Sequence, residues 1–145
     1  MTDDSGPKRI LVVDSDRRTV EWLKILLEHC GYDVRTAYMA GRGEELFRTW
    51  SPHLVITEAE LADQDGVELL QTFKSLKETT PIIMIAENAT VPLIVRAMQI
   101  GSCHFLQKPL EADHTVGLVE HFLQADAAAV PPATLAAPPQ PRAED

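Results

Sequence analysis

Two apolar segments of the sequence end in an acidic residue, and a third ends in a basic one. "RILVVD" ends at Asp14, "HLVITE" ends at Glu58, and "CHFLQK" ends at Lys108. Two carboxylates and an ammonium group can bind a cation, accept a transferred group or form an ion pair. Which of these they do depends on how the chain brings the three segments together.

Apolar runs alternate with helical patterns five times along the chain. The predicted strands are 9–14, 32–37, 53–58, 81–86 and 102–107. Apolar residues at helical spacing predict helices over 15–31, 40–50, 66–77, 90–101 and 111–124. Strands that are apolar throughout are typical of a parallel sheet covered on both faces. We therefore predict an α/β fold with a doubly wound, five-stranded parallel sheet.

The carboxyl ends of parallel strands share one edge of a sheet, and ligands bind at that edge in open α/β folds. Asp14, Glu58 and Lys108 are expected there together. The sequence has no G-x-G-x-x-G after a strand, no P-loop and no G-x-S-x-G elbow. Their absence counts against dinucleotide binding, a phosphate-binding loop for a flavin or nucleotide, and serine hydrolase chemistry.

Composition narrows the classes of partner. The 145 residues carry a formal net charge of −9, which argues against unaided nucleic-acid binding and favours protein partners. The two cysteines lack C-x-x-C spacing, so neither a redox motif nor a zinc motif is available. No signal peptide or membrane span is recognisable, and we expect a cytoplasmic location.

The sequence predicts one folded domain between two less structured ends. Residues 1–8 are polar and are predicted to be a disordered N-terminus, and 9–124 form the domain. Residues 125–145 hold half of the chain's ten prolines and many alanines. This composition predicts a disordered tail or a linker to an output domain.

The motifs at the strand ends resemble the receiver domains of response regulators. The resemblance covers residues 9–124 and is carried, in order, by "ILVVDSD", "PHLVITEAELADQDGVELL", "PIIMIA" and "AMQIGSCHFLQKPL". It implies a flavodoxin-like fold of five β/α repeats. It also implies a pocket in which a strand-end aspartate accepts phosphate from a histidine kinase, with Mg²⁺ bound beside it.

The sequence departs from the family's pattern at three pocket positions. Receivers end their first strand in two acids that hold Mg²⁺, and here these positions are Asp14 and Ser15. Glu58 stands where the family has the phospho-acceptor aspartate. Ala86 stands where the fourth strand normally ends in a Thr or Ser that binds the phosphoryl group. The family's lysine and the proline after it are kept as Lys108 and Pro109.

These departures change three groups that phosphoryl transfer needs: the acceptor carboxylate, a Mg²⁺ ligand and the hydroxyl that binds the phosphoryl group. Glu58 is one methylene longer than aspartate, and misplacing a reacting atom by about 1 Å can cost about a hundredfold in rate. Ser15 is a neutral ligand where Mg²⁺ favours a carboxylate. Phe105 occupies the family's switch position, but Ala86 has no hydroxyl to move it, so we expect Phe105 to serve in packing.

We therefore predict a degenerate receiver-like domain of two-component signalling that acts without phosphorylation and is not an enzyme. It has no cofactor, and Mg²⁺ binds weakly at most. It acts on a fused output domain or a protein partner, with transcriptional regulation as the downstream process. The contact surface that the resemblance implies is the fourth helix, fifth strand and fifth helix, and a homodimer is the other arrangement. The alternative is a genuine phospho-accepting receiver with an atypical Mg²⁺ site.

Lys108 needs an anionic partner, so its ammonium is expected within ion-pair distance of Asp14 or Glu58. At a partly open strand edge such a pair contributes about 0–1 kcal/mol. Asp14 and Lys108 remain open to two interpretations, a structural ion pair or the remnant of a metal site. The resemblance also implies a cis peptide bond before Pro109.

Overall fold

The computed structural model describes residues 6–124. Residues 1–5 of the predicted disordered N-terminus, and the whole of the Pro/Ala-rich segment 125–145, lie outside the described residues.

Five strands alternate with five helices, as the sequence predicts. The strands are β1 (Arg9–Val13), β2 (Asp33–Ala37), β3 (Leu54–Glu58), β4 (Ile82–Ala86) and β5 (His104–Gln107). The helices are α1 (Arg17–His29), α2 (Ala40–Trp50), α3 (Gly66–Leu76), α4 (Val91–Ile100) and α5 (Ala112–Gln124). β1 begins at Arg9 as predicted, and the other four strands begin one or two residues later than predicted.

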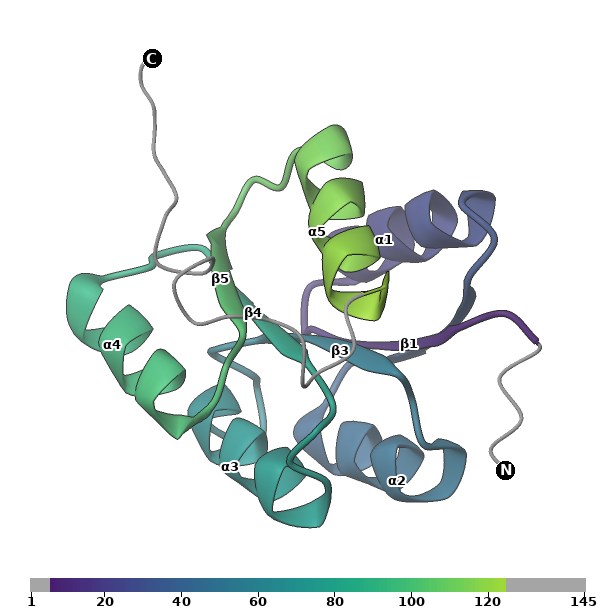
Figure 1. The fold of residues 1–145 in the computed structure, drawn as a ribbon. Coiled ribbons are helices and arrows are strands. Elements are labelled where there is room, and N and C mark those ends of the chain that lie inside the picture. Colours follow the sequence, from purple (N-terminus) through teal and green to yellow (C-terminus); the bar gives the residue numbers. More distant parts are fainter. Residues whose placement is uncertain (1–5, 125–145) are drawn as a thin grey trace.

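All five strands are parallel, in the order β2-β1-β3-β4-β5. Figure 1 shows α1 and α5 on one face of the sheet and α2, α3 and α4 on the other. This is the doubly wound arrangement that the sequence predicts. The strand order reverses between β1 and β3, which is where open α/β sheets form their ligand crevice.

Successive side chains of a strand point to opposite faces of the sheet, so the strands contribute to two apolar layers. Each layer packs against the helices on its own face. Leu11, Val55 and Met84 face α2 and α3, where Phe47 and Phe73 stack with ring centroids 4.4 Å apart. The other face carries the alternate residues of the same strands, which pack on α1 and α5. β1, β3 and β4 are covered on both sides, which explains their continuous apolar sequences.

Polar side chains fix where the helices begin on the strand-end side of the sheet. Asp16 caps α1 by accepting a hydrogen bond from Arg18 N–H at 3.2 Å, and Thr90 caps α4. Asp65 caps α3 through Val67 N–H at 2.9 Å. Each cap pairs an N–H that the helix leaves without a partner. In residues 6–124 no helix is both long and apolar enough to cross a membrane.

Gly66, the first residue of α3, lies against the backbone at the end of β3. A Cβ atom at residue 66 would overlap the carbonyl oxygen of Glu58 and would lie 2.8 Å from backbone atoms of Ala59. Real Cβ atoms do not approach backbone so closely, so any side chain at residue 66 must displace either α3 or β3. By contrast, a Cβ built on Gly117 in α5 meets nothing within 4 Å.

We predict that Gly66→Ala lowers the free energy of unfolding by about 3 kcal/mol or more, through backbone displacement beside Glu58. Gly117→Ala should instead raise it by about 0.5–1 kcal/mol, because alanine favours the helix. Urea unfolding followed by circular dichroism measures both. Equal stability of Gly66→Ala and wild type would contradict the close approach.

Candidate functional site

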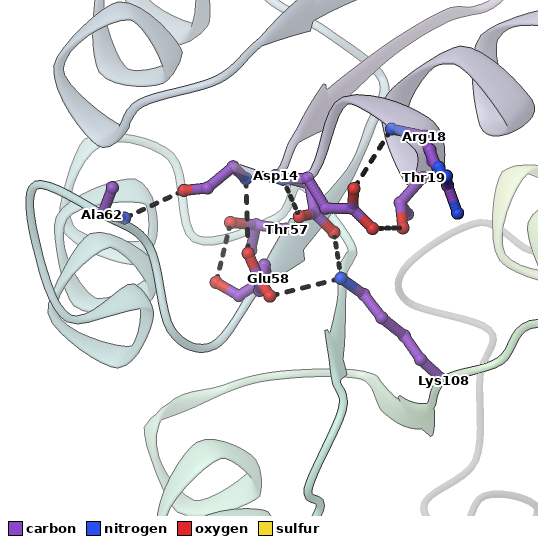
Figure 2. Close-up of polar contacts among 9 residues, drawn as sticks. Asp14, Arg18, Thr19, Thr57, Glu58, Ala62 and Lys108 are labelled. Carbon is purple, nitrogen blue, oxygen red and sulfur yellow. Dashed lines mark hydrogen bonds and ion pairs between the residues drawn. The ribbon is translucent and has the colours of Figure 1, made fainter.

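The carboxyl ends of β1, β3 and β5 bring the three charged side chains together. Asp14 directly follows β1, Glu58 is the last residue of β3, and Lys108 directly follows β5. Figure 2 shows the long Lys108 side chain reaching across the sheet edge to the two carboxyl groups. The register of the parallel strands places these ends side by side, since Glu58 pairs with Ile85 and Ala86 pairs with Gln107.

The predicted ion pair is confirmed, and it involves both carboxyl groups. Lys108 Nζ lies 2.9 Å from Asp14 Oδ2 and 3.2 Å from Glu58 Oε2. Asp14 Oδ2 is buried and accepts no hydrogen bond within the described residues, so the ammonium charge compensates it. Lys108 therefore forms a bridge between the ends of β1 and β3.

Backbone N–H groups occupy the other carboxyl oxygens. Asp16 N–H donates to Asp14 Oδ1 at 2.8 Å, and Ser15 N–H donates to Glu58 Oε1 at 3.3 Å. All four carboxyl oxygens of Asp14 and Glu58 therefore have a partner from this chain. The pocket is satisfied internally.

The expectation of a partly open pair is wrong, because the structure buries it. The exposed side-chain fractions are 9% for Lys108, 0% for Asp14 and 11% for Glu58. The surface-pair range of about 0–1 kcal/mol does not apply to such a group. Removing one partner of a buried pair leaves a charge uncompensated, and this typically costs about 3–5 kcal/mol.

Burial and the second carboxyl group make ionisation of Glu58 unfavourable. Desolvation, together with the hydrogen bond and charge of Asp14, raises the pKa of Glu58 to about 7 although Lys108 acts in the opposite direction. For Lys108, burial alone would lower the pKa, but the two carboxyl groups outweigh it and the pKa is raised. The ammonium therefore stays charged at neutral pH.

The other predicted residues lie at the strand ends or in β5. The hydroxyl oxygen of Ser15 accepts a hydrogen bond from Ala62 N–H at 2.9 Å. Ala86 is buried, and its carbonyl oxygen accepts from Lys108 N–H at 2.7 Å. The Lys108–Pro109 peptide bond is cis. Phe105 is partly buried and packs against the core layer that faces α2 and α3.

Sequence reasoning missed the contacts of the segment that follows β3. Asp63 Oδ1 accepts from Ala40 N–H at 2.8 Å, and Oδ2 accepts from Gly41 N–H at 3.2 Å. The backbone bonds lower the pKa of Asp63. Asp65 pairs with Arg96 of α4 at 3.4 Å. The acids of "ADQDG" were a signal for loop caps, but the sequence does not say which helix each one reaches.

A divalent cation of the kind that the resemblance implies does not fit these donors. Lys108 Nζ stands between the two carboxyl groups, and the outer oxygens are held by backbone N–H groups. The Ser15 hydroxyl is engaged by Ala62. Among the described residues no group of three or more His, Cys, Asp or Glu side chains is placed to hold a metal ion.

The raised pKa of Glu58 predicts a pH trend in stability. An unfolded glutamate titrates near 4.3, so between about pH 4.3 and 7 the unfolded chain binds fewer protons than the folded one. Wild-type stability therefore falls as pH rises through this interval. Glu58→Gln lacks this loss, and its stability relative to wild type should rise by about 3 kcal/mol from pH 4 to pH 8.

Urea unfolding at a series of pH values measures this trend, with Glu21→Gln on the exposed face of α1 as the matched control. Parallel pH curves for wild type and Glu58→Gln would contradict the unfavourable ionisation of Glu58.

Comparison with known proteins gives one consistent match. The model of the response regulator receiver domain matches residues 10–120. Transcriptional regulatory protein FixJ of Bradyrhizobium diazoefficiens is 31% identical over 121 residues, which are 83% of this chain and 59% of FixJ. Two-component response regulator ARR12 of Arabidopsis thaliana is 29% identical over 81% of this chain and 20% of its own length. The chain thus spans only part of these relatives.

Solved structures agree with the sequence match. A CheY-like receiver domain from Methanospirillum hungatei is 28% identical and superposes with a TM-score of 0.79, over 81% of this chain and 94% of that one. NtrX from Brucella abortus is also 28% identical, with a TM-score of 0.77 over 81% of this chain and 27% of its own. Fold, strand-end pocket and sequence all lead to one assignment: the chain belongs to the response regulator receiver domain family of two-component signalling.

Proposed function

We propose that this receiver domain signals without phosphorylation, with Glu58 as a fixed substitute for the acceptor aspartate. The observation that carries the proposal is the buried bridge from Lys108 to Asp14 and Glu58. In this arrangement the glutamate carboxyl group already holds the lysine. The pocket then stays in one state, and the domain acts as a signalling module rather than an enzyme.

The chemistry of acyl phosphate formation supports the proposal. A carboxylate oxygen must attack phosphorus in line with the leaving group, while positive charge neutralises the transferring phosphoryl oxygens. Both Glu58 oxygens are engaged, by Ser15 N–H and by Lys108, and only 8% of the residue is exposed. Ala86 has no hydroxyl to receive a phosphoryl group. Freeing the carboxylate would break a buried ion pair, which is costly.

The output surface in this proposal is the face of α4, β5 and α5. α4 is the most apolar helix surface of the described residues: Val91 is 71% exposed, Val95 46% and Met98 39%. Ala97 is its one buried residue, and Arg96 its one charged residue. In Figure 1, α4 stands at the outer edge of the sheet beside β5. Exposed apolar side chains in one group mark interaction surfaces.

A protein partner or a fused output domain fits this surface. The relatives include FixJ, a transcriptional regulatory protein of which the matched region is only a part. We propose that this chain likewise serves transcriptional regulation through another domain or protein. A homodimer through the same face is the second arrangement.

Incubation with acetyl phosphate and Mg²⁺, followed by intact mass spectrometry, tests the loss of phosphorylation. We expect no phosphoryl adduct on wild type, because the acceptor, the cation ligand and the hydroxyl are replaced together. The triple variant Ser15→Asp, Glu58→Asp, Ala86→Thr should gain an adduct. A stable wild-type adduct on Glu58 would instead support a genuine receiver with an atypical site. A folded triple variant that remains unlabelled would show that the pocket is misassigned.

The α4 surface is tested by pull-down from the native host with three baits. Val95→Glu places a charge in the centre of the apolar face and should lose the specific partner, since a desolvated lone charge weakens binding roughly tenfold or more. Ile25→Glu on α1 is the matched control, because Ile25 is 67% exposed on the opposite layer. Sedimentation of the same proteins reports self-association. A partner retained by Val95→Glu but lost by Ile25→Glu would assign the surface to α1.

A further inference from the structure

The loop between β3 and α3, residues 59–65, is tied across the pocket edge by a side chain of the first loop. Ala62 N–H donates to Ser15 Oγ at 2.9 Å, the contact drawn as a dashed line from Ala62 in Figure 2. Ala62 itself is exposed. The Ser15 hydroxyl is therefore the group that gives this amide a protein partner.

The same loop is fixed on its other side. The carboxylate of Asp63 accepts from the first two N–H groups of α2, Ala40 and Gly41. Gly66 N–H closes the loop by donating to Ala59 O at 2.8 Å. With Ala59, Asp63 and Gly66 held in this way, the bond from Ala62 to Ser15 adds the contact between the loop and the segment that follows β1.

Ser15 also contacts the site through its backbone. Its N–H donates to Glu58 Oε1 while its hydroxyl accepts from Ala62. One residue therefore holds both the glutamate and the loop that follows it. It does so without adding charge to a buried set of two carboxyl groups and one ammonium group.

We propose that Ser15 is a positioning residue that closes the 59–65 loop over the Glu58 pocket and makes this closure independent of a divalent cation. A neutral hydroxyl joins the two loops directly. A carboxylate in its place would be a third negative group near Asp14 and Glu58, with only Lys108 to balance it, and closure would then require a bound cation.

This inference deepens the proposed function and rests on it for the identity of the pocket. Its test uses no phosphodonor, so the two can fail separately. An unlabelled wild type with an unchanged loop in Ser15→Ala would refute the role of Ser15 alone. A labelled wild type with a Ser15-dependent loop would refute phosphorylation independence alone.

The experiment is amide hydrogen exchange of the full chain, read at Ala62 by NMR, in EDTA and in millimolar MgCl₂. In wild type we expect the same protection in both solutions. Ser15→Ala should speed exchange of Ala62 roughly tenfold in both, and Ser15→Thr, which keeps a hydroxyl, should restore protection. Ser75→Ala is the matched control, because the Ser75 hydroxyl donates to Thr72 O on the exposed side of α3.

Ser15→Asp distinguishes a cation-independent closure from general loop packing. We expect fast exchange at Ala62 in EDTA and slow exchange in MgCl₂, with an unfolding midpoint that rises only when Mg²⁺ is added. Unchanged protection in Ser15→Ala would overturn the positioning role. Equal protection of Ser15→Asp in both solutions would overturn the link between the neutral hydroxyl and cation independence.

Discussion

The strand-end pocket of this domain depends on one ammonium group, Lys108, that is shared by two buried carboxyl groups. Lys108 comes from the end of β5, whereas Asp14 and Glu58 come from β1 and β3, so the pair spans the sheet edge. Three ionisable groups in a buried place are tolerated only when they compensate one another. The strand register, the N–H groups of residues 15 and 16 and the close approach at Gly66 all serve to keep that compensation in place.

The two carboxyl groups have unequal environments although they share one lysine. Asp14 has no exposed surface and lies 2.9 Å from the ammonium, while Glu58 lies at 3.2 Å and ionises only near pH 7. Near neutral pH the group that gains or loses a proton is therefore Glu58. Lys108 keeps its proton, because its pKa is raised. A neutral glutamic acid can still hydrogen-bond, so the pocket keeps its arrangement with less negative charge than a phosphorylated aspartate would bring.

The fold and the central ion pair could be predicted because both follow from local pattern and one topological rule. Apolar runs ending in Asp14, Glu58 and Lys108 give parallel strands, and parallel strands place their ends at one edge. The burial of the pair could not be predicted, since it depends on how loops 59–65 and 14–16 close over the pocket. The partners of Asp63 and Arg96 were likewise hidden, because exposed charges gain partners only once distant helices are placed.

α4 buries few of its side chains against the rest of the domain, and this affects the free energy of binding a partner on that helix. With Ala97 as its one buried residue, and Leu93 and Ile100 packing only in part, this helix contributes little of the apolar burial that stabilises the sheet. Elements held by few buried groups open locally at a fraction of the global unfolding free energy. A protein that covers Val91, Val95 and Met98 would therefore also stabilise the folded form of α4. Its affinity would then report the local equilibrium of α4 as much as the complementarity of the two surfaces.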